Sequence, residues 1–185
     1  MISYEITKEQ EAFCLKHANL MARGAITKSF KHDKIQSEDV YFIGKIGELT
    51  VLKFLKTLEN DNFLKINHKP FRDNYERFNW NDDFIVNDTQ LEVRTKARSV
   101  NPLSHYECCT DCIKPFLTYI FVSYNKLNKV STIVGYATEK LLREKSTVAT
   151  KGDSNSNFVH KVNEYNIQIK NLFDINNFKD VIINR

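Results

Sequence analysis

One short stretch holds side chains of the types that phosphodiester chemistry requires. Asp83 opens a β-prone run, and Glu92, Arg94 and Lys96 occupy every second position of the run that follows it. Since side chains alternate across a strand, these three share one strand face. Carboxylates can hold a hard divalent cation, and basic groups can meet a phosphate. The stretch is therefore a candidate site for cleaving phosphodiester bonds.

A β-hairpin is expected to position these groups. Residues 82–96 consist of two runs, rich in branched and aromatic side chains, on either side of a polar Asn-Asp-Thr turn. This is the pattern of a hairpin. In its second strand, Leu91, Val93 and Thr95 face one way and the polar residues face the other.

The hairpin resembles the active-site hairpin of the PD-(D/E)XK nuclease superfamily, which has Asp on one strand and Glu-x-Lys on the next. Asp83 and Glu92 match this pattern, whereas Arg94 stands at the lysine position. Lys96, two residues further on the same face, is a candidate for the missing amine. The resemblance implies an α/β (α+β) fold with a restriction endonuclease-like core, in which helices flank a central mixed β-sheet.

A helix is predicted over residues 40–58, ahead of the hairpin, and Glu48 lies on its apolar stripe with Val51 and Leu55. A buried carboxylate must be paired, capped or bound to metal. The alternative is an ordinary salt bridge at the edge of the stripe. Gly44 and Gly47 weaken a helix, so they are expected where it closely approaches another backbone.

The resemblance adds a role for this helix. A Gly-x-x-Gly-Glu run before the hairpin is common in the superfamily, and its Glu often joins the metal site. The order Glu48, Asp83, Glu92 is the family order. Asp83 and Glu92 would hold one Mg²⁺ (or Mn²⁺), with Glu48 as a direct, water-mediated or second-ion ligand. Arg94 would stabilise the pentavalent oxyanion but cannot act as a base, whereas Lys96 could do either.

Cations and aromatic side chains interleave in the loop predicted at residues 68–81. Phosphate pairing and base stacking both favour such a surface for nucleic acid. Phe71 and Phe78 are instead expected to anchor the loop to the core. The candidate DNA-binding residues are Lys69, Arg72, Arg77 and Arg98.

A second cluster consists of His105, Cys108, Cys109 and Cys112. This spacing is close to that of zinc ligands, so a structural Zn²⁺ is one interpretation. Reduced free thiols are the leading interpretation. A disulfide framework is not expected in a chain that looks cytoplasmic.

Length and composition indicate one domain over residues 1–185, with 42% hydrophobic and 27% charged residues. It divides into a helical lead-in at 1–38, a core at about 40–137 and an extension at 138–185. No signal peptide or membrane span is evident, so a cytoplasmic location is expected. The net charge of +4 mildly favours a polyanionic partner.

Local signals indicate further elements. Thr7 and Gln10 have the spacing of a capping box, which predicts the start of a helix. Gly24 can end this helix, and His17 is expected to be packed on its apolar face. Thr138 is expected to cap a short helix. Strands are predicted at residues 63–66, 116–123, 130–136 and 165–169, a connection at 26–38, irregular structure at 98–115 and a mobile loop at 146–157.

These observations favour a metal-dependent DNA endonuclease. Because one such core holds one phosphodiester site, double-strand cleavage would need a two-fold homodimer. One alternative is a catalytically inactive nuclease fold that only binds DNA. Another is a protein without a nucleic-acid partner, in which Asp83, Glu92, Arg94 and Lys96 form a surface charge ladder.

Overall fold

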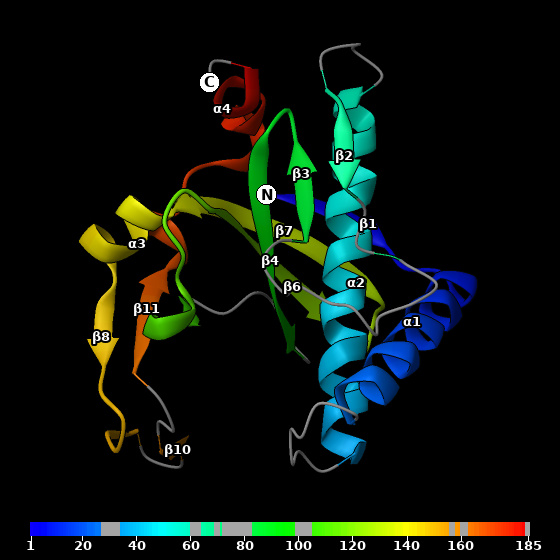
Figure 1. Ribbon diagram of the computed structural model, residues 1–185, viewed down its shortest axis with the longest axis horizontal. Coiled ribbons are helices and arrows are strands. Elements are labelled where there is room, and N and C mark those ends of the chain that lie inside the picture. The colour runs from blue at the N-terminus through cyan, green and yellow to red at the C-terminus, as the bar shows by residue number, and fades with distance from the viewer. Residues whose placement is uncertain are drawn as a thin grey trace.

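A computed structural model describes residues 1–26, 34–59, 64–68, 71, 83–98, 105–155, 158–159 and 163–183. Its centre is a curled, mixed six-stranded sheet in the order β1-β7-β6-β4-β3-β2 (Figure 1). The strands are β1 (Ile2–Glu5), β7 (Val130–Thr138), β6 (Thr118–Asn125), β4 (Thr89–Arg98), β3 (Phe84–Val86) and β2 (Ile66–His68). β4 and β6 are parallel, and the other neighbours are antiparallel.

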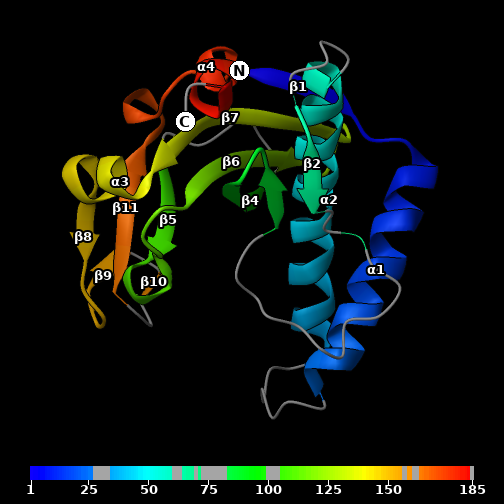
Figure 2. The same ribbon diagram turned by 45° about the horizontal axis from the view of Figure 1, so that its top comes forward.

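Helices flank this sheet, so the predicted mixed α+β class is confirmed at that level. α2 (Lys34–Glu59) packs on β4, β6 and β7, and α1 (Lys8–Ile26) packs against α2 (Figure 2). α3 (Glu139–Lys145) contacts β7. α4 (Phe178–Ile183) is the last element of the chain. None of the described helices combines the length and apolarity needed to cross a membrane.

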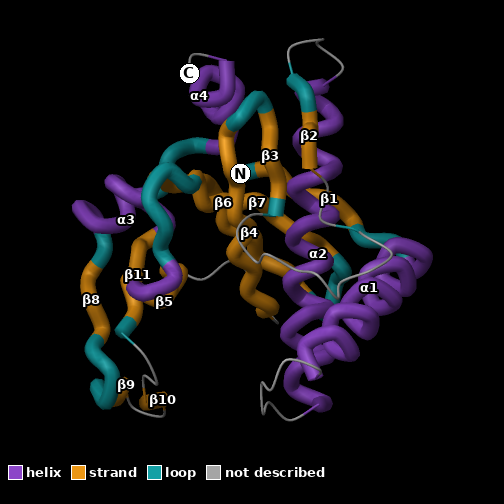
Figure 3. Tube along the Cα trace, in the orientation of Figure 1, coloured by secondary structure: helices purple, strands orange, loops and turns teal. Residues whose placement is uncertain are grey.

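A second, three-stranded sheet has the order β5-β11-β8 (Figure 3). Its strands are β5 (His105–Cys109), β11 (Glu164–Gln168) and β8 (Thr147–Ala149). The prediction of irregular structure at 98–115 was therefore wrong for residues 105–109, and the prediction of a loop at 146–157 was wrong for residues 147–149 and 154–155. Residues 105–109 and 147–149 become strands because they pair with β11, which lies far from β5 in the sequence and supplies hydrogen bonds that no local signal reveals.

Shorter elements complete the chain. β9 (Ser154–Asn155) pairs with β10 (Phe158–Val159). The 3₁₀ helices are η1 (Thr110–Cys112), η2 (Ile169–Asn171) and η3 (Ile175–Asn177). The predicted strands at residues 116–123, 130–136 and 165–169 correspond to β6, β7 and β11 with small shifts of their ends.

Alternation along the strands creates two apolar cores. Ile120 and Val122 of β6 pack with Val51 and Leu55 of α2 on one face of the sheet. Phe121 and its neighbours pack on the other face with residues of β5 and β11. The side of β4 that carries Leu91 and Val93 therefore meets α2, while the polar side turns toward the second sheet.

Local signals at the helix starts are largely confirmed. The Thr7 N–H donates to Gln10 Oε1 at 3.1 Å and the Gln10 N–H to Thr7 Oγ1 at 3.3 Å, which completes the capping box. Thr138 caps α3 by accepting from the Leu141 N–H at 3.3 Å. However, α1 passes Gly24 and ends at Ile26, and α2 already begins at Lys34, inside the predicted connection.

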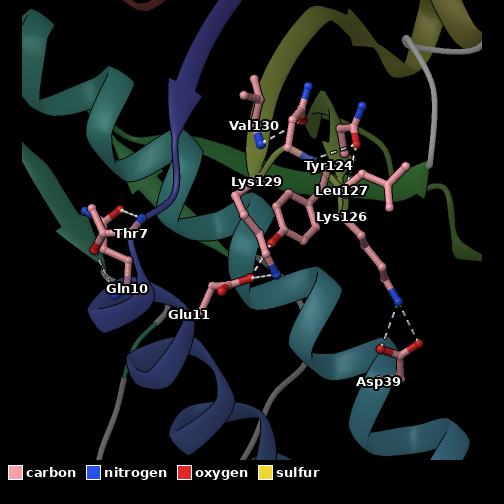
Figure 4. A network of polar contacts seen from close by, with 11 residues as sticks. Thr7, Gln10, Glu11, Asp39, Tyr124, Lys126, Leu127, Lys129 and Val130 are labelled. Atoms are coloured by element: carbon pink, nitrogen blue, oxygen red, sulfur yellow. Dashed lines mark hydrogen bonds and ion pairs between the residues drawn. The ribbon is translucent and has the colours of Figure 1, made fainter.

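Polar contacts fasten the helices to the turn between β6 and β7 (Figure 4). Glu11 of α1 accepts from the Tyr124 hydroxyl and from Lys129 Nζ, each at 2.7 Å. Lys126 pairs with Asp39 of α2 at 3.1 Å, an exposed contact of small energetic value. His17 is buried, with its ring centroid 4.6 Å from that of Phe13, as expected for a packed histidine.

Candidate active site

The hairpin forms as predicted. The register Phe84↔Leu91, Ile85↔Gln90 and Val86↔Thr89 joins β3 to β4. Asn87 and Asp88 form the turn with φ of 45° and 66°. Asn and Asp tolerate this left-handed region better than other non-glycine residues, and two successive positive φ values match the twist of a hairpin.

Asp83 lies where β3 begins, directly against β4. Its N–H donates to the Leu91 carbonyl at 2.9 Å, and its Oδ2 accepts from the Val93 N–H at 2.7 Å. The carboxylate thus takes the place of a backbone acceptor at the edge of β4. Because it is bonded to Val93, it lies beside the backbone of Glu92.

Glu48 reaches this region from α2. A Cβ added at Gly47 would lie 1.8 Å from Thr95 Oγ1, so the helix crosses β4 at very short range there. This agrees with the expected role of Gly47. At Gly44, an added Cβ would meet no described atom within 4 Å, so no close approach is seen there within the described part of the chain.

The environment of Glu48 is strongly electrostatic. Its side chain is 9% exposed, and its Oε2 lies 2.5 Å from Lys45 Nζ. Burial and the negative charges of Asp83 and Glu92 raise its pKa to about 8, although Lys45 acts in the opposite direction. The structure therefore brings Glu48 within electrostatic reach of both hairpin carboxylates.

Cationic side chains hold two of these carboxylates. Glu48 pairs with Lys45, and Glu92 Oε1 lies 3.3 Å from Arg94 Nη2. Within the described part of the chain, no three His, Cys, Asp or Glu residues are arranged to hold a metal ion. Asp83, Glu92 and Glu48 offer carboxylate oxygens, and oxygen ligands are those that a hard divalent cation prefers. They fit Mg²⁺ chemically, provided that Glu48 and Glu92 exchange their present cationic partners for it.

Lys96 points to a different neighbour. It forms an ion pair with Glu107 of β5, and its Nζ lies 6.0 Å from the centre of the Tyr106 ring. Burial raises the pKa of Glu107, but the hydrogen bond and charge of Lys96 prevail and lower it. Lys96 therefore bridges the two sheets, whereas Arg94 is the cation next to Glu92.

Arg98 ends β4 and lines a cavity of about 330 Å³, together with Lys96 and with Val40 and Ile43 of α2. Its Nε is buried and has no hydrogen-bond partner among the described residues. The other candidate DNA-binding residues, Lys69, Arg72 and Arg77, lie outside the part of the chain that the structure describes.

The extended form of β5 argues against a zinc site in the second cluster. Cys108 is buried on one side of the strand, whereas His105 and Cys109 belong to the other side. His105 and Cys109 are four residues apart, roughly 13 Å along a strand, too far to share one tetrahedral ion. His105 Nε2 instead lies 3.3 Å from Glu107 Oε1. The side chain of Cys112 lies outside the described residues.

The thiols should differ in reactivity. Burial is the main cause that raises the pKa of Cys14 to about 12 and of Cys108 to about 11, whereas Cys109 is partly exposed. We expect iodoacetamide at pH 8 to modify Cys109 in the native protein and to spare the other two, because only the thiolate reacts. Peptide mapping before and after denaturation measures this. Rapid native labelling of Cys108 would contradict its buried position.

Glu48 should make stability depend on pH in the metal-free protein. Its folded-state pKa of about 8 exceeds the ordinary 4.5, so the folded state binds the extra proton and stability falls as pH rises between these values. Glu48→Gln should therefore match the wild type at pH 4.5 and have the higher melting temperature at pH 9, by roughly 2–4 °C for each kcal/mol that ionising Glu48 costs the wild type. Calorimetry in EDTA tests this. If Glu48→Gln and the wild type had equal melting temperatures at pH 9 as well as at pH 4.5, the raised pKa of Glu48 would be contradicted.

Lys45 is the site residue that sequence reasoning missed. It lies one helical turn before Glu48, on the same apolar stripe, and is as deeply buried. The i, i+3 spacing of a lysine and a glutamate on that stripe was the available signal.

Comparison with protein-family models, with curated proteins and with solved structures found no match.

Proposed function

We propose that this protein is a Mg²⁺-dependent DNA endonuclease whose site consists of Asp83, Glu92 and Glu48. The observation that carries the proposal is the position of Asp83, whose Oδ2 accepts from the Val93 N–H at 2.7 Å and which therefore lies beside the backbone of Glu92. Burial and, to a lesser extent, the charges of Asp83 and Glu92 raise the pKa of Glu48. Neighbouring carboxylates repel one another. A divalent cation bound among them would relieve this repulsion.

Asp83 and Glu92 would hold the ion, the Val93 carbonyl would assist, and Glu48 would bind it directly or through water. When bound, such an ion lowers the pKa of its water and neutralises charge on the phosphate. The water oxygen would bond to phosphorus as its proton passes to solvent, the bond to the leaving sugar oxygen would break, and that oxygen would take up a proton from solvent. Arg94, paired with Glu92, would hold the phosphate and remain charged throughout.

The polar face of β4 suits a DNA strand. Arg94, Lys96 and Arg98 follow Glu92 on one strand face, spaced by roughly 6.6 Å. Such a row of cations can follow the phosphate backbone without reading sequence. Two subunits would be needed to cut both strands, so a homodimer belongs to the proposal.

Supercoiled plasmid incubated with Mg²⁺ or Mn²⁺, with and without EDTA, tests this function. Nicked or linear DNA that appears only without EDTA is the expected result. Complete absence of cleavage with either metal would reject it. Binding of labelled DNA without cleavage, with cleavage restored by Arg94→Lys, would instead favour the inactive DNA-binding alternative, because that change restores the lysine of the pattern.

A further inference from the structure

Phe116 is an exposed aromatic residue in a strained backbone conformation. It is 83% exposed, and its φ is 70°. Bulky residues are rarely found at positive φ, because Cβ then crowds the backbone. Single exposed apolar residues are common on protein surfaces, but this one also occupies a backbone position that glycine would adopt without strain. Neither packing nor local conformation therefore accounts for a phenyl ring at this position.

The backbone around Phe116 forms a turn with anchored ends. Pro115 precedes it, and a proline followed by a residue of positive φ is typical of a type II turn. Glycine or asparagine is usual at the second of these positions. Ile113 and Leu117 on either side are buried in the core that β6 shares with β5 and β11. The turn thus presents the ring to solvent on a fixed base.

The strand register places this turn near the proposed site. β4 and β6 are parallel neighbours, and Glu92 is the partner of Tyr119. Tyr119 packs on the face of the sheet to which the polar side of β4 turns, and its hydroxyl accepts from the Lys114 N–H at 2.8 Å. Phe116 precedes Tyr119 by three residues, which span at most about 11 Å, and neighbouring strands are about 4.8 Å apart. The Cα atoms of Phe116 and Glu92 are therefore at most about 16 Å apart.

A nucleobase is the flat partner that an exposed ring beside a phosphodiester site can bind. Stacking of a base on an aromatic side chain adds to affinity whichever base it is. In an intact duplex the neighbouring base pairs cover both faces of a base, so stacking there requires unstacking first. An unpaired base offers its face directly. Cations that follow Glu92 along β4 can meanwhile hold the phosphates of the same strand.

We propose that Phe116 stacks on a base of the bound DNA a few nucleotides from the bond that is cleaved, and that DNA with unpaired bases there is the preferred substrate. This inference rests on the proposed nuclease function and names the substrate class of the same site. The anchored turn holds the ring in place before DNA arrives, so little conformational freedom is lost on binding. The ring contributes to affinity and takes no part in the chemistry.

Affinity for a labelled single strand in EDTA, which stops metal-dependent cleavage, tests the stacking. Phe116→Gly should bind at least about fivefold more weakly than the wild type, the loss expected for one stacked base. Phe116→Trp should bind within about twofold of the wild type, because it keeps an aromatic face. Leu127→Gly is the matched control, since Leu127 is 76% exposed and follows the opposite end of β6. It should leave the affinity unchanged.

Two further measurements separate stacking from a role in the fold. Phe116→Gly should melt no lower than the wild type, because glycine accepts positive φ and the lost ring is largely exposed. The added indole of Phe116→Trp should lose fluorescence when the strand binds, and the wild type, with its single tryptophan, gives the background. Weaker binding together with a lower melting temperature would make Phe116 a residue of the fold, and an unquenched indole would place it away from DNA. Either result overturns the inference.

Cleavage rates separate this inference from the nuclease function. The wild type should cut a single-stranded circle at least about tenfold faster than the relaxed duplex circle of the same sequence, because the duplex must first be unstacked. Phe116→Gly should narrow that difference. Equal wild-type rates on the two circles, or unchanged DNA affinity in Phe116→Gly, would overturn the inference while the nuclease function stands.

Two other outcomes would also overturn it. If Phe116→Gly converts a wild-type dimer into a monomer in sedimentation, the ring belongs to a contact between subunits. If the wild type cuts neither circle with Mg²⁺ or Mn²⁺, the nuclease function is rejected and the substrate preference falls with it.

Discussion

Asp83→Asn should lower the initial rate of Mg²⁺-dependent plasmid cleavage at least a thousandfold with little change in melting temperature. Several kcal/mol of charge stabilisation depend on the ion that Asp83 would hold, and each ~1.4 kcal/mol is tenfold in rate. Asparagine has the same shape and keeps an oxygen that can accept the Val93 N–H now bonded to Asp83 at 2.7 Å. The fold should therefore survive while the ligand charge is lost.

Two further variants sharpen this test. Asp83→Ala should lose activity equally but also lose stability, by about 1–3 kcal/mol, because the edge N–H of Val93 loses its acceptor. Glu92→Gln should resemble Asp83→Asn in activity. Retention of more than a tenth of the wild-type rate by Asp83→Asn, in protein free of contaminating nuclease, would remove Asp83 from the metal site.

Gly47→Ala should destabilise the protein by about 1–3 kcal/mol or more, because overpacking an interior contact forces neighbouring atoms to move. The new methyl carbon would lie 1.8 Å from Thr95 Oγ1 and 2.9 Å from Thr95 Cβ. Gly44→Ala is the matched control, because an added Cβ there meets no described atom within 4 Å. It should stabilise the helix by about 0.5–1 kcal/mol. Urea denaturation of both variants measures the two effects.

A double variant tests the cause. Thr95→Ala removes the two Thr95 atoms beyond Cβ and should recover part of the stability that Gly47→Ala loses, so the two changes should be non-additive. Additive losses would show that Gly47 does not meet Thr95. A Gly47→Ala protein as stable as the wild type would show that α2 does not approach β4 as closely as described. The position of Glu48 near the hairpin would then lose its structural support.

Local sequence was sufficient for the parts of the site that depend on near neighbours. The hairpin follows from alternation in its strands and from Asn87 and Asp88, which accept positive φ. The burial of Glu48 follows from the apolar stripe of its helix. These preferences act within a few residues, so a sequence displays them directly.

The tertiary structure decided which groups face one another. β5 and β8 exist because both pair with β11, and the extended form of β5 keeps His105 and Cys109, two of the possible zinc ligands, apart. It also gives Lys96 its partner Glu107. Close helix–strand contact distinguishes Gly47 from Gly44, and burial joins Lys45 to Glu48. Such choices depend on contacts between distant segments and on loss of solvent, neither of which a local pattern encodes.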